Sequence, residues 1–130
     1  MKTLIIMTIL VVSAFAQRNP QIRTCNITGG NFSVLNIQVD KVGHCNYGDA
    51  SVDTISLMDK VYENKESMAV KQFLDGVTDC RGIIITGFNN VETALICYYN
   101  DKSSIRLSTL NAGNNSPANK NLVEALNSQI

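Results

Sequence analysis

The stretch of sequence that decides the fold is residues 82–110, GIIITGFNNVETALICYYNDKSSIRLSTL. It holds two short apolar runs, 82–88 and 91–99, and a third run from residue 104 to about residue 110. Turn signals rich in Asn, Asp and Ser separate these runs, a pattern typical of β-strands joined by tight turns. We therefore predict a three-stranded antiparallel meander over about residues 82–110.

The turns at the two ends of the middle strand set the register of this meander. Closing the second turn on Asp101 and Lys102 places Tyr98 opposite Ile105. If the first turn closes around residues 88–89, it sets the pairing of the first strand with the second. The pairings set by the two turns then place apolar residues of all three strands on the same face of the sheet. That predicted face consists of Ile83, Ile85, Ala94, Ile96, Tyr98, Ile105 and Leu107.

The chain has four cysteines, Cys25, Cys45, Cys80 and Cys97. An even number of cysteines in a secreted chain predicts two disulfides. No Cys-x-x-Cys pair occurs, which argues against a zinc site and against a dithiol redox centre. The first hairpin register sets Cys80 opposite Cys97, so of the three possible pairings we prefer Cys80 with Cys97 and Cys25 with Cys45.

Two helical regions are predicted from the spacing of apolar residues. From Ser51 to Gly76 these residues recur at helical spacing with one polar interruption, and Asp49 or Ser51 is the expected N-cap. This region is either one long bent helix or a helical pair. Ser116 and Pro117 have the N-cap and N1 pattern that begins a short amphipathic C-terminal helix.

The remaining pattern lies near the start of the domain. A turn signal at residues 29–31 lies between residues 22–27 and a stretch in which Leu35, Ile37 and Val39 share one face, which predicts a strand that forms one arm of a hairpin. Together these elements predict an α+β fold. Its antiparallel sheet, with a three-stranded meander (about 82–110), is packed by central helices (about 51–76), with a short C-terminal helix and two disulfides.

The N-terminal segment has the pattern of a cleavable signal peptide. Lys2 precedes an apolar run over residues 4–12, and Ala14-Phe15-Ala16 provides the small residues that signal peptidase requires. The run is shorter than the roughly 20 residues needed to span a bilayer. We expect residues 1–16 to be removed and residues 17–130 to form a single secreted domain without a stable membrane anchor. The alternatives are a signal anchor and a buried N-terminal strand.

The charge balance limits the classes of partner. The 130 residues include 11 basic and 11 acidic side chains, and the leader contributes only Lys2, so the mature chain has ten basic residues against eleven acidic ones. Proteins that bind nucleic acid or attack anionic membranes normally have a basic excess, so no nucleic-acid partner is expected. No Gly-rich phosphate loop is present, and no cofactor or metal is expected.

Three Asn-x-Ser/Thr sequons begin at Asn26, Asn31 and Asn114. Each is a candidate glycosylation site if the source is eukaryotic. Pro117 directly follows the third sequon and weakens it. Asn26 and Asn31 are therefore the predicted glycan sites.

Candidate catalytic residues are few. His44 is the only histidine, so a mechanism that uses two imidazoles is excluded. Because it lies between Gly43 and Cys45, we expect it in a disulfide-bounded turn. Five carboxylates could supply a pair for glycoside hydrolysis, but their spacing mostly fits the wet face of a helix. They are Asp49, Asp53, Asp59, Glu63 and Glu66.

These observations favour a small, secreted, non-enzymatic binding or effector protein of extracellular fluid. Its partner would be an extracellular protein or a small apolar ligand. The predicted binding surface is a pocket lined by Tyr62, Phe73 and Tyr98, or else an exposed region between Cys25 and Cys45. Two alternatives stay open: a secreted hydrolase that uses His44 or a carboxylate pair, and a protease inhibitor that presents a disulfide-framed loop.

Overall fold

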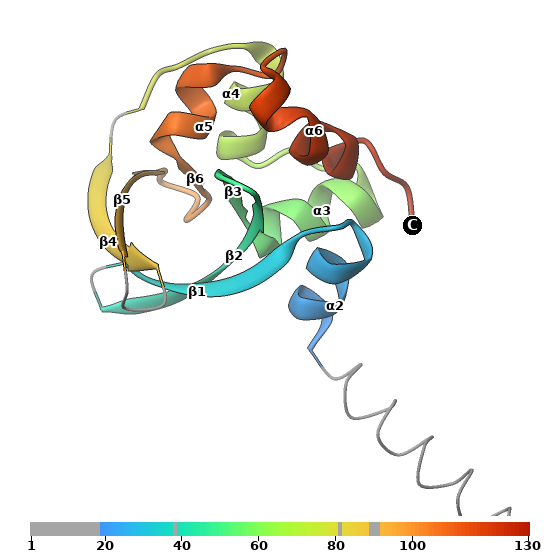
Figure 1. Ribbon diagram of the computed structural model, residues 1–130, viewed down its shortest axis with the longest axis horizontal. Coiled ribbons are helices and arrows are strands. Elements are labelled where there is room, and N and C mark those ends of the chain that lie inside the picture. The colour runs from blue at the N-terminus through green and yellow to red at the C-terminus, as the bar shows by residue number, and fades with distance from the viewer. Residues whose placement is uncertain (1–18, 38, 81, 89–91) are drawn as a thin grey trace, which may run out of the picture.

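The computed structural model describes residues 19–37, 39–80, 82–88 and 92–130 (Figure 1). The expected signal peptide and the expected turn at Asn89-Asn90 lie outside the described residues. The fold is α+β, as predicted: helices pack against one antiparallel sheet.

The sheet closes on itself into a barrel with the strand order β1-β2-β3-β6-β5-β4. Antiparallel pairs join each strand to the next, and the pair Leu35 and Phe88 joins β1 to β4. This closure was not predicted from the sequence. The strands of the barrel are β1 (Asn31–Ile37), β2 (Asp40–Tyr47), β3 (Ala50–Asp53), β4 (Ile83–Phe88), β5 (Glu92–Tyr98) and β6 (Ser104–Arg106).

The helices gather on one side of the barrel, and β4 with its neighbours lies on the uncovered side (Figure 1). α3 and α4 form the predicted central pair, and a 3-10 turn followed by α6 forms the predicted C-terminal helix. The helical elements are α2 (Pro20–Ile27), α3 (Thr54–Glu63), α4 (Met68–Asp75), α5 (Leu107–Ala112), the 3-10 turn η1 (Pro117–Asn119) and α6 (Lys120–Leu126).

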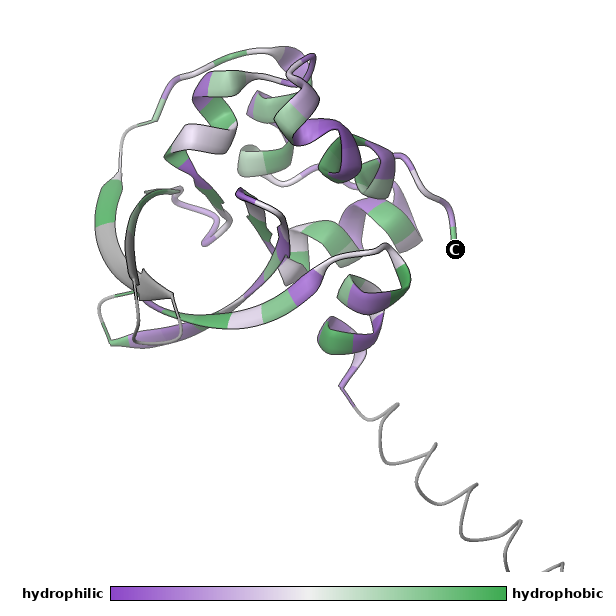
Figure 2. Cartoon of the chain, viewed as in Figure 1, coloured by the Kyte–Doolittle hydropathy of each residue, from purple (hydrophilic) through white to green (hydrophobic). Residues whose placement is uncertain are grey.

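Each strand has one face toward the barrel interior, and the outer faces of the strands on the covered side pack against the helices. The main core lies between barrel and helices, where Val52 and Ile105 pack with Leu57, Phe73 and Leu126. A smaller cluster, Leu35, Ile37 and Ile96, packs inside the barrel with Val42, Ile84, Ala94 and Tyr98. Both apolar and polar residues appear along the barrel strands in the hydropathy colouring of Figure 2.

Short polar side chains fix where the central helices begin. Asp53 is the N-cap of α3 and accepts a hydrogen bond from the Ser56 N–H, while Ser67 caps α4 through the Val70 N–H. The expected caps Asp49 and Ser51 are wrong because β3 occupies residues 50–53. Gly76 ends α4 in the left-handed conformation, as its position predicts.

The meander is confirmed, but both predicted registers are wrong. Ile83 pairs with Cys97, and Tyr98 pairs with Ser104 rather than with Ile105. Both shifts are by an odd number of residues, so they exchange the two faces of β4 and β6 relative to β5. Of the predicted face, Ala94, Ile96 and Tyr98 point into the barrel, whereas Ile83 and Ile105 lie on the outer face.

The second turn explains part of this difference. The predicted turn centres on two residues, but the turn that forms is longer, and Lys102 takes a left-handed φ of 70° within it. Lysine does not signal that conformation, which Gly or Asn would have indicated. The third strand also ends at Arg106, and Leu107 begins α5 instead of extending the sheet to residue 110.

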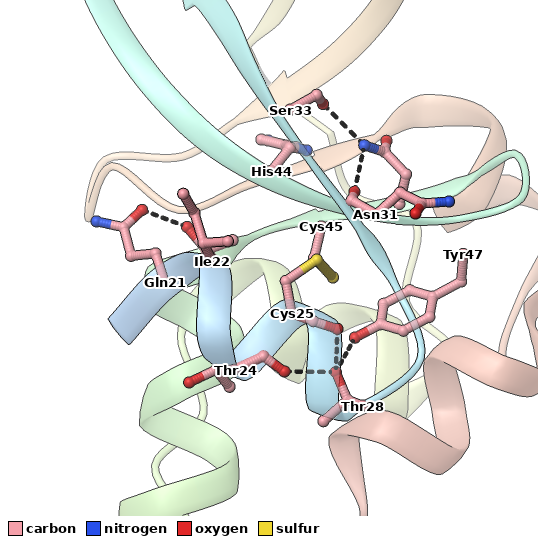
Figure 3. The surroundings of a disulfide bond; sticks show 12 residues. Gln21, Ile22, Thr24, Cys25, Thr28, Asn31, Ser33, His44, Cys45 and Tyr47 are labelled. Atoms are coloured by element: carbon pink, nitrogen blue, oxygen red, sulfur yellow. Dashed lines mark hydrogen bonds between the residues drawn. A yellow bond between two sulfur atoms is a disulfide. The ribbon is translucent and has the colours of Figure 1, made fainter. Parts of the chain in front are cut away.

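The two disulfides have the preferred pairing, Cys25 with Cys45 and Cys80 with Cys97. The first connects α2 to β2 and lies in the main core (Figure 3). The second connects β5 to the segment before β4, with the two Cα atoms 5.5 Å apart. The pairing is thus correct although the register from which it was predicted is not.

Candidate functional site

A cleft of about 710 Å³ lies at one end of the barrel. Its walls come from the first residues of β2, the first turns of α3, the segment between α3 and α4, and the turn between β5 and β6. Gln21 of α2 and Tyr98 at the end of β5 complete the lining. Segments far apart in the sequence therefore build one concave surface, the arrangement usual for ligand sites.

The cleft is lined mainly by charged and hydrogen-bonding side chains. Its acidic residues are Asp40, Asp53, Asp59, Glu66 and Asp101, and its basic residues are Lys41, Lys65 and Lys102. Lys65 forms an ion pair with Glu63, outside the cleft. Within the described part of the chain, no ion pair involves the other charged residues of the lining.

Asp53 is the buried carboxyl group of this lining. Its Oδ1 accepts hydrogen bonds from the Ser56 hydroxyl at 2.5 Å and from the Ser104 N–H at 3.0 Å, and its Oδ2 accepts from the Ser56 N–H at 2.9 Å. Burial raises the pKa of Asp53, although these hydrogen bonds act in the opposite direction. Asp53 therefore joins the start of α3 to β6, and its main role is structural.

Asp101 is more exposed, and its carboxylate is held in place by the start of α4. Oδ2 accepts a hydrogen bond from the Met68 N–H at 2.9 Å, and Oδ1 accepts from the N–H and the hydroxyl of Ser103. Partial burial raises the pKa of Asp101, but these hydrogen bonds outweigh burial and leave the pKa below its ordinary value. Asp101 is thus a fixed, ionised carboxylate at the rim of the cleft.

Tyr98 also borders a second, smaller hollow of about 370 Å³. Met68, Gln72 and Gly82 are among the residues that line this hollow. A Cβ atom at Gly82 would lie 2.5 Å from the Tyr98 carbonyl oxygen, so only glycine permits the close approach of the two backbones there. The Tyr98 N–H donates to the Gly82 carbonyl at 2.7 Å, which fixes the position of Tyr98 between the hollows.

No family model, no curated protein and no solved structure matches this chain.

His44 is not in a turn, contrary to the prediction. It lies on β2 and points into the barrel, on the opposite side of the strand from Cys45 (Figure 3). Its side chain is fully buried, and its two ring nitrogens lie 2.6 Å from the Ser51 hydroxyl and 2.7 Å from the Ser104 hydroxyl. Burial, together with the charge of Arg106, lowers the pKa of His44 to about 3. This neutral, enclosed imidazole has no access to a substrate.

The three aromatic residues of the predicted pocket lie apart. Tyr98 lines the cleft, whereas Phe73 is buried in the main core. Tyr62 is on the outer side of α3, where its hydroxyl lies 3.0 Å from the hydroxyl of Thr24. The disulfide between Cys25 and Cys45 is fully buried, whereas the segment that it encloses includes the exposed residues Ile27 and Val39.

The structure divides the predicted carboxylates. Asp53, Asp59 and Glu66 line the cleft, whereas Asp49 and Glu63 are exposed elsewhere. Sequence reasoning did not select four charged lining residues, Asp40 and Lys41 at the start of β2 and Asp101 and Lys102 in the turn between β5 and β6. Local sequence gave no signal for them, because the closure of the barrel is what brings these two segments together.

The predicted glycan sites are accessible in the fold. The side chains of Asn26 and Asn31 are exposed, at the end of α2 and the start of β1. The amide of Asn114, in contrast, donates hydrogen bonds to the carbonyls of Phe73 and Leu74. This arrangement agrees with the preference for the first two sequons.

Two further features bear on the chemistry. Within the described ranges, no three His, Cys, Asp or Glu side chains are grouped so that they could hold a metal ion. Among the helices of the same ranges, none has the length and apolar composition needed to cross a bilayer.

Proposed function

We propose that this protein is a secreted, non-enzymatic binding protein of extracellular fluid, and that the cleft is its ligand site. The observation that carries this proposal is the convergence of Asp40, Lys41, Asp59, Glu66 and Lys102 on one concave surface. Their charges are not used within the described fold. Charged side chains held without a partner around a concavity are suited to recognise polar groups of another molecule.

Several features support an extracellular location. Two disulfides are typical of proteins that fold in an oxidising compartment. The signal-peptide pattern of residues 1–16 and the exposed sequons at Asn26 and Asn31 agree with passage through a secretory route. Mass spectrometry of the protein from its native source should find a chain that begins at Gln17 with glycans at these two sites.

The lining favours a polar ligand over the small apolar ligand expected from the sequence. Charged side chains would lose their hydration against an apolar molecule and gain no hydrogen bonds in return. Among the described lining residues, the aliphatic side chains are those of Val42 and Ile55.

Affinity capture from the extracellular fluid of the source organism tests the proposal. The immobilised wild type should retain a component that the charge-reversal variant Asp59→Lys/Glu66→Lys does not retain. Asp49→Lys is the matched control, because Asp49 is an exposed acidic residue outside the cleft. Equal retention by all three proteins would show that the cleft is not the ligand site.

One observation favours a second candidate function, hydrolysis by a carboxylate pair. Asp53 and Asp101 line the same cleft, and their pKa values are shifted in opposite directions, as expected of an acid and a base. We rank this function second because Asp53 is occupied as a helix cap. A hydrolase would turn over a chromogenic glycoside, and Asp101→Asn would abolish this turnover. The unfolding midpoint of the variant should fall only by the small amount expected from weakening the hydrogen bonds of Asp101 with Met68 and Ser103.

A further inference from the structure

We propose that the ligand of the cleft is a linear, uncharged oligosaccharide that lies across Tyr98, with sugar units in the hollows on both sides. This inference rests on the proposed function and adds the chemical class of the ligand.

The first argument is the shape of the surface. The cleft of about 710 Å³ and the hollow of about 370 Å³ have Tyr98 as a shared lining residue. A compact ligand would need only the larger one. Two hollows that share a lining residue suit a ligand made of repeated units, because each unit can occupy a separate depression.

The second argument is the kind of polar group in the lining. The lining contains carboxylates, which accept hydrogen bonds, and ammonium groups, which donate them, and Ser56, Ser67 and Ser103 add hydroxyls that do both. A strongly charged ligand would meet like charges at several of these positions. A saccharide has neutral hydroxyls that donate and accept, so it can bond to both kinds of group without an uncompensated charge.

The third argument is Tyr98 itself. Its side chain is half-buried, and its hydroxyl makes no hydrogen bond within the described part of the chain. The Tyr98 backbone is fixed by its hydrogen bond to the Gly82 carbonyl, and its side chain packs against the interior cluster of the barrel. A rigid aromatic ring with a free hydroxyl offers both a stacking surface for the C–H face of a pyranose and a polar contact at its edge.

The surface around Tyr98 is already ordered without a ligand. Asp101 is fixed by the Met68 N–H, and the Ser103 hydroxyl accepts a hydrogen bond from the Ala69 N–H at 3.1 Å. These contacts tie the turn between β5 and β6 to the start of α4. Binding would therefore require little ordering of this wall, which lowers the entropic cost of association.

The test is an NMR titration of the disulfide-bonded mature protein with chitotetraose, cellotetraose and xylotetraose, each up to about 10 mM, a range that detects weak binding. At least one sugar should shift the amide resonances of Tyr98, Asp101 and Ser103. Tyr98→Leu, which keeps an apolar side chain in the barrel, should weaken binding by about tenfold or more, the effect of one lost stacking or hydrogen-bond contact. The matched control is Tyr62→Leu, which should bind like the wild type.

Three results would overturn the inference. One is the absence of shifts with every sugar, another is a set of shifts that maps away from both hollows, and the third is binding of a tetra-arginine peptide but of no sugar. If affinity capture still depends on Asp59 and Glu66, any of these results removes the oligosaccharide while the proposed binding function stands. If capture also fails to depend on them, both proposals are wrong.

Discussion

His44 is a titratable side chain enclosed in the barrel, and its ionisation links the stability of the fold to pH. The ordinary pKa of 6.5 applies to the unfolded chain, whereas burial and the charge of Arg106 lower the folded value to about 3. The stability that neutral His44 contributes is fully present above about pH 6.5 and falls as the pH drops toward the folded pKa. The slope for one proton is about 1.4 kcal/mol per pH unit.

We therefore expect urea unfolding to give a lower free energy of unfolding at pH 5 than at pH 7, by about 2 kcal/mol. His44→Gln should lose this difference, although it will be less stable than the wild type at pH 7. The raised pKa of Asp53 acts in the opposite sense, because its contribution is present at low pH and is lost as the pH rises. Asp53 is present in both the wild type and His44→Gln, so the difference between the two proteins reports His44 alone. If the free energy of unfolding of the variant depended on pH as that of the wild type does, the prediction would be wrong.

Gly30 is a second residue whose identity is set by its neighbours. A Cβ atom there would lie 2.3 Å from the Cys45 sulfur and 3.1 Å from the Cys25 sulfur. Gly30→Ala should lower the free energy of unfolding by about 2–3 kcal/mol, as overpacking of a core does. Gly29→Ala is the matched comparison, because its positive φ costs about 1 kcal/mol but its Cβ would meet no atom within 4 Å.

Chemical denaturation of both variants, with a count of free thiols, measures this difference. A larger loss in Gly29→Ala than in Gly30→Ala would show that backbone conformation, and not crowding around the disulfide, decides these positions.

At the scale of elements, the N-caps of α3 and α4 form one hydrogen-bonded chain. The Ser67 hydroxyl donates to Ser56 Oγ at 2.7 Å and accepts from the Val70 N–H, and the Ser56 hydroxyl donates to Asp53. Ser67→Ala removes both contacts of Ser67 and should lower the free energy of unfolding by about 2 kcal/mol.

Ser116→Ala is the comparison for this prediction. Ser116 caps η1 through the Ala118 N–H alone, so its loss should have roughly half the effect or less. If urea unfolding gave equal losses of unfolding free energy for the two variants, the hydrogen bonds that link Ser67, Ser56 and Asp53 would add nothing to the effect of an ordinary N-cap.

Apolar periodicity reports helices and strands directly and indicated β1, the central helices, the meander and the C-terminal helix, but α2, β3 and α5 were missed. The positions of Gly76, Ser116 and Pro117 gave correct helix boundaries, and alternation at Leu35 and Ile37 gave β1. The register between β5 and β6 was not predictable, since it depends on the left-handed conformation of Lys102. β2 was also missed, because its inner face carries His44 and Asn46 in place of an apolar alternation.

At the scale of the whole molecule, the two disulfides differ in access to solvent. Cys25, Cys45 and Cys97 are fully buried, whereas Cys80 is half-buried in the segment before β4. Mild reductant should open the bond between Cys80 and Cys97 first, because a thiolate can reach the Cys80 sulfur without unfolding the core. Alkylation and mass spectrometry at successive times will show the order. Simultaneous loss of both bonds would mean that reduction follows global unfolding.

The candidate site could be predicted only in part, for a reason that also belongs to this scale. Asp59 and Glu66 were recognised as available carboxylates, and Tyr98 as a pocket residue. Their association with Asp40 and Asp101 depends on which turns meet at the end of the barrel, and that is fixed by the strand order. Local sequence patterns do not encode strand order, so the cleft could be found only from the complete fold.

The pairing of Leu35 with Phe88 has a consequence for how copies of this protein behave together. In an open sheet, β1 and β4 would be terminal strands whose free N–H and C=O groups could recruit a strand from another molecule. Closure of the barrel through this pairing leaves neither strand at the end of an open sheet, and this reduces the tendency to form strand-linked polymers. If the barrel opened between β1 and β4, both strands would become edge strands. Each of them could then pair with a strand of another molecule, so polymers would start from this position.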